Sequence, residues 1–237
     1  MLELKGLPGV LYGVSEWVMR LSAVNLIWFL MSLPLFVLLL TFDMGSQVGI
    51  VLFAPASWLL GSLLFFPATA AVFATARDWV LDTGQSSVLR TYFSHLKRDY
   101  KDSAKMGGGF AVLWLGWYYA NFFFQSESSF LAFMFLLSGS SLFIYTINFL
   151  SISAHYRMSG GERLKNAFFV SAGSPLMGLS ILLSCGLLLW ISMTQLLWLL
   201  PFLTCSLIAF LSFAAFHKFT MKVEEKRRRT LDAKATM

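Results

Sequence analysis

Charged residues are scarce in this sequence: Asp, Glu, Lys and Arg make up 13% of its 237 residues, whereas 57% are apolar. A soluble globular domain has about 25% charged residues, so this composition excludes one. Intrinsic disorder requires low hydrophobicity and high net charge, and is excluded on the same grounds. Only two cysteines are present, too few for a disulfide-stabilised secreted module. The sequence therefore predicts an integral membrane protein.

Six uncharged stretches are long enough to cross a bilayer. A hydrocarbon core of about 30 Å requires about 20 helical residues, at about 1.5 Å per residue. Short polar breaks join the stretches in pairs. We therefore predict an all-α polytopic membrane protein, a single domain over residues 1–237 with three helical hairpins. The six predicted spans are residues 21–42, 48–73, 106–124, 130–152, 175–193 and 196–216.

The basic residues are predicted to lie on one side of the membrane. All 18 Lys and Arg residues precede the first span, follow the last one in the tail 217–237, or lie in the two links between hairpins. The only charged residues in the breaks inside the hairpins are acidic, Asp43 and Glu127. Because short loops rich in Lys and Arg remain in the cytoplasm, we predict that both termini are cytoplasmic. The net charge of +6 then reflects topology and requires no nucleic-acid partner.

Asp, Glu, Lys, Arg and His are absent from all six predicted spans. Such groups inside a membrane mark proton relays, ion paths or catalytic pairs, so their absence weighs against a proton-coupled transporter and most intramembrane hydrolases. The three histidines lie outside the spans and lack HExxH or a comparable ligand spacing. We therefore expect no catalytic residue, no metal site and no cofactor, and a membrane enzyme is the least favoured class.

Uncharged polar residues do occur within the spans. Asn25 lies in the first span, and Ser141, Tyr145 and Asn148 share one helical face of the fourth. Hydrogen bonding between helices is the default role of such residues in a membrane. The alternative is that these four residues line a polar track for a neutral solute.

The longer cytoplasmic link has the pattern of an amphipathic helix. Over residues 83–105, apolar residues recur at helical spacing while basic residues occupy much of the remaining surface, as in helices at a membrane interface. One interpretation is that this segment only connects two hairpins while its basic residues contact anionic lipids. The other is a docking surface for a partner, formed by Tyr92, Phe93, Lys97, Arg98 and Lys101.

The amino-terminal half resembles the YesL-like family of bacterial integral membrane proteins of unknown function. The resemblance rests on RLSAVNLIW, SLP, PATAA, RDWV and KRDYKDS, at residues 20–28, 32–34, 67–71, 77–80 and 97–103. It covers roughly residues 10–110 well and the remainder loosely. It implies the bacterial inner membrane and a role near carbohydrate uptake, and it brings no assigned catalytic residues.

These observations predict a non-enzymatic accessory or regulatory component of the inner membrane, associated with carbohydrate uptake and in contact with a transporter component. The alternative function is a small neutral-solute permease with a polar track through the helix bundle. The two differ in where the functional residues lie: on the cytoplasmic helix in the first case, inside the bundle in the second.

Overall fold

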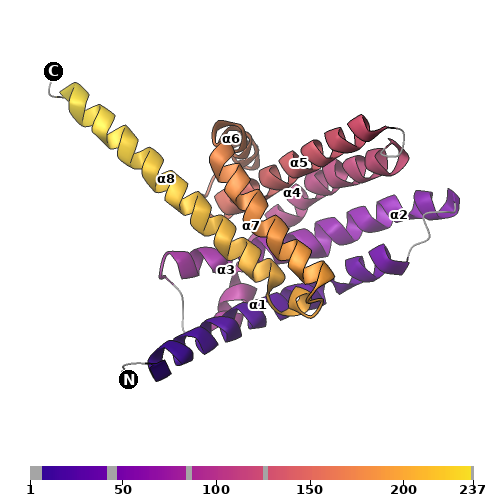
Figure 1. Ribbon diagram of the computed structural model, residues 1–237, viewed down its shortest axis with the longest axis horizontal. Coiled ribbons are helices and arrows are strands. Elements are labelled where there is room, and N and C mark those ends of the chain that lie inside the picture. The colour runs from indigo at the N-terminus through magenta and orange to yellow at the C-terminus, as the bar shows by residue number, and fades with distance from the viewer. Residues whose placement is uncertain (1–6, 42–46, 84–86, 125–127, 236–237) are drawn as a thin grey trace.

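The computed structural model describes residues 7–41, 47–83, 87–124 and 128–235, and these residues form helices joined by short links, without strands. Two short π-helical turns, η1 and η2, continue directly into α3 and α8. The elements are α1 (Leu7–Thr41), α2 (Gln47–Leu60), η1 (Gly61–Phe65), α3 (Phe66–Val80), α4 (Val88–Phe124), α5 (Ser129–His155), α6 (Gly160–Gly173), α7 (Pro175–Thr194), η2 (Leu200–Thr204) and α8 (Cys205–Ala235) (Figure 1).

Five of the helical segments are long and apolar enough to cross a membrane. They are Gly9–Thr41, Val51–Val80, Ser129–His155, Pro175–Thr194 and Leu200–Asp232, and each overlaps one of the predicted spans. The remaining predicted span, 106–124, forms the second half of α4. Glycine, tryptophan, tyrosine and asparagine in that half make it less hydrophobic than the other five.

Helices continue beyond the apolar stretches from which the spans were predicted. The second span ends at residue 73 in the prediction, but α3 extends to Val80. The amphipathic segment and the third span form one continuous helix, α4, and α8 runs through the basic tail as far as Ala235. Charge ends a hydrophobic stretch, but it does not end a helix, because the backbone hydrogen bonds continue through the charged residues.

The core is centred on α3, which contacts α1, α4, α5 and α8. Small residues cover much of its buried surface, and Ala68, Ala71 and Ala76 are almost completely inaccessible. Small side chains let helix backbones approach closely in a membrane. Gly107 of α4 does the same from the opposite side, because a Cβ atom there would lie 2.7 Å from the Cβ of Phe66.

A buried amide joins the first helix to the last. Asn25 of α1 is completely buried; its Nδ2 donates to the carbonyl of Leu200 at 2.8 Å, and its Oδ1 accepts from the backbone N–H of Ser206 at 2.9 Å. Pro201 interrupts the helical ladder here, because proline has no N–H to donate. Asn25 therefore satisfies one backbone group of η2, the carbonyl of Leu200, and one backbone group of the first turn of α8, the N–H of Ser206.

This contact sets the position of the third hairpin. Asn25 lies about 24 Å along α1 from Thr41, at about 1.5 Å per residue. The link between α7 and α8 consequently lies beside the middle of α1, whereas the adjoining ends of α1, α2, α4 and α5 lie together at the end of the molecule opposite both termini (Figure 1).

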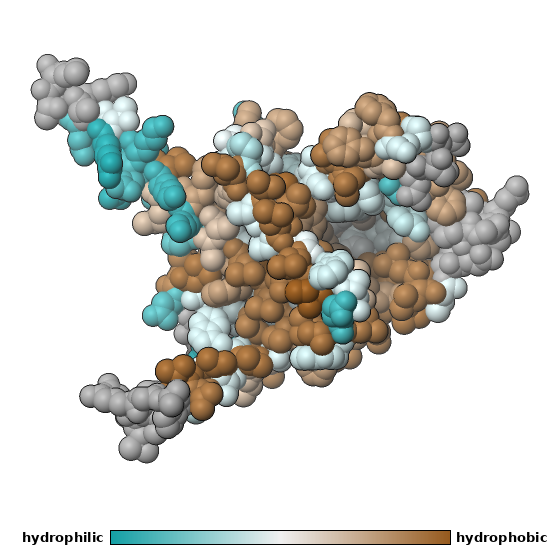
Figure 2. Space-filling view, viewed as in Figure 1, coloured by the Kyte–Doolittle hydropathy of each residue, from teal (hydrophilic) through white to brown (hydrophobic). Residues whose placement is uncertain are grey.

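Large apolar side chains cover much of the outer surface. On α7, Leu176, Leu183, Leu187 and Trp190 are each more than half exposed. Figure 2 shows apolar colouring over α7 and the neighbouring helices, and hydrophilic colouring along the carboxy-terminal part of α8. An apolar surface of this extent is a membrane-facing surface. The chain is therefore a multi-pass membrane protein.

Candidate functional site

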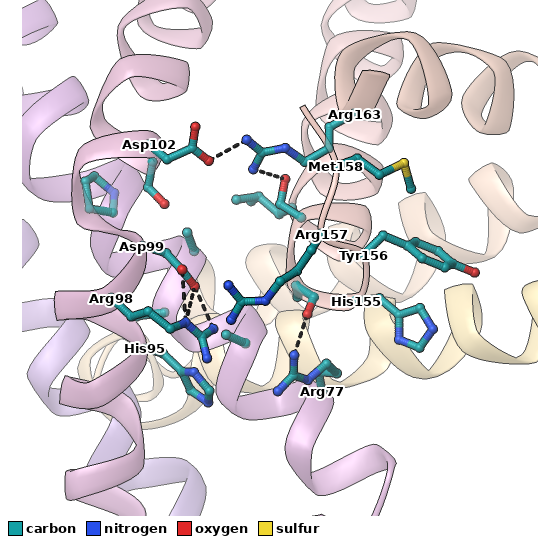
Figure 3. Close-up of a pocket in the computed structure, with 18 of the residues that line it drawn as sticks. Arg77, His95, Arg98, Asp99, Asp102, His155, Tyr156, Arg157, Met158 and Arg163 are labelled. Carbon is teal, nitrogen blue, oxygen red and sulfur yellow. Dashed lines mark hydrogen bonds and ion pairs between the residues drawn. The ribbon is translucent and has the colours of Figure 1, made fainter. Parts of the chain in front are cut away.

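A polar pocket of about 520 Å³ lies between α3, the first half of α4, the end of α5 and the start of α6 (Figure 3). Its charged lining residues lie outside the predicted spans, on the side predicted to be cytoplasmic. One part of the lining is apolar and the other part carries these charged residues. The apolar lining includes Pro67, Ala70, Ala71, Ala74 and Leu150.

An ion-pair network built on Asp78 joins three helices at one edge of the pocket. Arg77 donates from Nε to Asp78 Oδ1 at 2.9 Å and from a terminal nitrogen to the carbonyl of Ala154 on α5 at 2.7 Å. The Nε2 atom of His95 on α4 lies 2.7 Å from Asp78 Oδ2. Since a carboxylate only accepts, His95 carries its proton on Nε2. Asp78 and His95 are each only 7% exposed, so this network holds α3, α4 and α5 together.

A second pair, Arg98 and Asp99, lies on α4 nearer to solvent. Arg98 Nε donates to both carboxylate oxygens of Asp99, at 3.0 and 3.1 Å. Burial raises the pKa of the Asp99 carboxyl, but the hydrogen bond from Arg98 and the charges of Arg98 and Arg157 outweigh it and hold that pKa below its usual value. Asp99 is therefore ionised at neutral pH.

The start of α6 places Arg163 in the pocket. Ser159 caps this helix: its Oγ accepts from the backbone N–H of Glu162, and the Glu162 carboxylate accepts from the Ser159 N–H. This capping box fixes the first turn of the helix. Arg163, in that turn, pairs with Asp102 of α4 and donates to Ser153 Oγ at 3.4 Å.

Two groups at the pocket retain unused hydrogen-bonding capacity. Arg163 is 9% exposed, yet its Nε has no partner, and the same is true of His95 Nδ1. Arg157, which precedes α6, forms no ion pair or hydrogen bond with the residues that the structure describes, and its guanidinium points toward Asp99. Within the described residues, no group of three or more His, Cys, Asp or Glu side chains is arranged to hold a metal ion.

The predicted docking residues of α4 separate into three environments. Phe93, Lys97 and Lys101 are exposed and follow one another at intervals of one helical turn. Arg98 lines the pocket. Tyr92 is completely buried and donates to the carbonyl of Ala68 at 3.3 Å, so it does not contribute to an outer surface.

The predicted polar residues of the spans are also separated. Asn25 lies between α1 and the start of α8, as described above. Asn148 is buried and donates to Ser171 Oγ of α6 at 2.9 Å, while Tyr145 donates to a backbone carbonyl of the same helix. Ser141 is exposed and donates within its own helix. None of the four lines the polar pocket.

The pocket itself is absent from the sequence-based prediction. Apart from Arg98, which is assigned there to the docking surface, its basic residues serve in that prediction only as markers of the cytoplasmic side. The sequence does carry one trace of the site, an Arg-Asp pair repeated at residues 77–78 and 98–99. Which basic residue faces which acid depends on how α3, α4 and α6 pack, and that is not a local property.

Comparison with known proteins gives a family context. Residues 21–122 match a family described as "Protein of unknown function, DUF624". The chain is also 25% identical to the "Uncharacterized protein YesL" of Bacillus subtilis (strain 168), over 96% of this chain and 99% of that protein. The resemblance to the YesL-like family is confirmed. No solved structure matches the chain.

The YesL-like relationship covers the pocket unevenly. The residues of the Asp78 network and the acidic residues of α4 lie within the matched residues 21–122, whereas Arg157 and Arg163 lie beyond them. The relative's full-length alignment includes both parts.

Proposed function

We propose that this YesL-like protein is a non-enzymatic accessory or regulatory component of a bacterial carbohydrate-uptake system. It crosses the inner membrane six times, with both termini in the cytoplasm. The observation that carries the proposal is the exposed row of Phe93, Lys97 and Lys101 on α4. An aromatic ring flanked by two cations at intervals of one helical turn suits a partner surface that is partly apolar and partly acidic.

The topology is supported by charge and by the arrangement of helices. The second half of α4 packs against α2, α3 and α5, helices that are themselves long and apolar enough to span or that belong to a spanning segment. If this half also crosses the membrane, as the third crossing along the chain, it brings the chain to the side from which α5 starts. The total is then six crossings. The crossing of the third hairpin is the part of this topology that most needs a test, because the turn of that hairpin lies beside the middle of α1.

Single cysteines introduced at Ser128, Gln195 and Thr230 test this topology. The two native cysteines are buried, so a membrane-impermeant maleimide reports on the introduced thiols. We expect labelling of Ser128→Cys and Gln195→Cys in intact spheroplasts, and of Thr230→Cys only after permeabilisation. Cytoplasmic labelling at Gln195 would show that the third hairpin does not cross the membrane.

Co-purification tests the partner role. The full chain, isolated from native membranes in mild detergent, is expected to bring down a carbohydrate-transporter component that mass spectrometry identifies. The double variant Lys97→Glu/Lys101→Glu is expected to reduce the recovered amount about tenfold or more, since a like-charge contact costs several kcal/mol at an interface.

The matched control for that experiment is Lys222→Glu/Lys226→Glu, which reverses two exposed charges on α8. We expect this control to retain the partner. Equal recovery with both double variants, or recovery of no transporter component with the unaltered chain, contradicts the proposed role.

The permease alternative has less support from the arrangement of polar groups. A solute path needs polar residues that converge on one cavity. Here Asn25 and Asn148 each hydrogen-bond to a different neighbouring helix, and Ser141 faces outward. These are the contacts of residues that join helices in a membrane.

A further inference from the structure

The charged end of the pocket contains more hydrogen-bond donors than its own acids use. Four arginines line it: Arg77, Arg98, Arg157 and Arg163. A guanidinium carries five N–H donors. Arg77 directs all three of its nitrogens to Asp78 and Ala154, and is satisfied. The other three retain donors.

The donors that remain belong to arginines of α4, of α6 and of the link that precedes α6. Arg98 binds Asp99 through Nε and one terminal nitrogen, which leaves the other terminal nitrogen. Arg163 retains Nε, which is buried without a partner. The whole guanidinium of Arg157 is unpaired among the described residues, and in Figure 3 it points toward the Arg98–Asp99 pair.

A buried donor without an acceptor costs about 1–3 kcal/mol. The arrangement around Arg163 is therefore unfavourable unless an acceptor enters the pocket. Each acid of α4 in the pocket already faces a guanidinium, and the carboxylate of Glu162, which also lines the pocket, accepts from the backbone N–H and the hydroxyl of Ser159. An incoming anion therefore meets carboxylates that already have partners, and arginine donors that have none. Arginine is the residue best suited to bind planar or tetrahedral oxyanions, since it presents two parallel N–H groups.

The rest of the pocket limits what the oxyanion is attached to. A volume of about 520 Å³ lies within the range of about 300–1,000 Å³ typical of small-molecule sites, and exceeds what a bare inorganic ion fills. Pro67, the alanines of α3 and Leu150 form the apolar part of the lining. A ligand with one anionic end and a less polar body matches both ends.

We propose that this pocket binds a phosphate monoester, with its phosphoryl oxygens held by Arg98, Arg157 and Arg163 and its body against the apolar surface of α3. The phosphate belongs to a soluble organic phosphate or to the headgroup of a lipid such as phosphatidic acid. This site is separate from the row of Phe93, Lys97 and Lys101, so the phosphate site and the partner role are independent proposals, and one can fail while the other holds.

Binding is measured on the full chain in detergent micelles after removal of bound lipid. The soluble probe is glycerol 3-phosphate, with glycerol as its neutral counterpart, and both are titrated by calorimetry. The lipid probe is phosphatidic acid in mixed micelles, compared with phosphatidylcholine. We expect saturable binding of at least one phosphate monoester, and none of glycerol or phosphatidylcholine.

Two variants assign the site. Arg157→Gln removes an exposed, unpaired guanidinium and leaves the helix contacts intact. Arg163→Lys retains the charge opposite Asp102 and removes the Nε–H donor. Each is expected to raise the dissociation constant about tenfold or more, as the loss of a charge-assisted hydrogen bond does. The control Arg228→Gln lies on the exposed tail of α8 and is expected to change it less than about twofold.

The outcomes separate cleanly. Binding of glycerol 3-phosphate alone, phosphatidic acid alone, or both supports the site and identifies the source of the phosphate. The proposal is overturned if neither binds the unaltered chain, if glycerol binds as well as its phosphate, or if Arg228→Gln weakens binding as much as Arg157→Gln. Should Arg163→Lys prove misfolded by gel filtration, Arg157→Gln decides alone.

Discussion

Replacement of Asp78 with alanine is expected to lower the free energy of unfolding by roughly 3–5 kcal/mol, the usual cost of removing one partner from a buried ion pair. The carboxylate accepts from Arg77 and His95 together. Without it, a guanidinium and an imidazole face each other with no acceptor between them, and α4 loses its link to α3 at this point. Unfolding by denaturant titration in mixed micelles measures the change.

The matched control is Asp99→Ala, which removes the same group from the Arg98 pair. That pair is largely open to solvent, with Asp99 43% exposed in its side chain, and exposed pairs contribute about 0–1 kcal/mol. We therefore expect the control to remain close to the unaltered chain. If the two variants lose equal stability, the Asp78 network does not hold the helices together.

The variant Asn25→Leu is expected to destabilise the protein almost as strongly. The leucine leaves the carbonyl of Leu200 and the N–H of Ser206 without the partners that Asn25 provides. Each buried group that loses its partner costs about 1–3 kcal/mol. The same denaturant titration measures the loss, and limited proteolysis near η2 is expected to become faster.

The control for this variant is Ser141→Ala, another polar residue of a predicted span. Its hydroxyl bonds only to Leu137 within its own helix, so its removal is expected to leave stability within about 0.5 kcal/mol. An Asn25→Leu protein as stable as Ser141→Ala would contradict the role assigned to the amide.

The sequence alone is sufficient to predict an all-helical membrane protein and the approximate place of most spans. Apolar length is a local property, and the bilayer imposes it directly. The ends of the helices were harder to predict, because Arg77 and Asp78 stop the apolar run although they pair with each other and α3 continues through them. A hydropathy scale scores each charged residue by itself and takes no account of an oppositely charged partner.

The amphipathic pattern of α4 illustrates a second limit. Periodicity identifies an apolar face, but it does not say whether lipid, a partner or the protein itself covers that face. Tyr92 and Phe93 are adjacent aromatic residues, yet Tyr92 lies in the core and Phe93 on the surface. The difference arises from how α4 crosses α3, which only the tertiary structure determines.

The site was beyond prediction for a related reason. Two of its ion pairs join residues far apart in the chain, Asp102 with Arg163 and Asp78 with His95. The number of residues between the two partners follows no recognisable motif. In a sequence whose basic clusters are predicted to be cytoplasmic, each of these arginines is fully explained by the predicted topology, so nothing marks them as members of a pocket.

The amide contact between α1 and η2 also has a consequence for biogenesis. Translation reaches Asn25 long before Leu200 and Ser206, which lie 175 and 181 residues further along the chain. Throughout that interval the amide lacks both of these partners, so the contact between α1 and the start of α8 forms only after the final hairpin has been made.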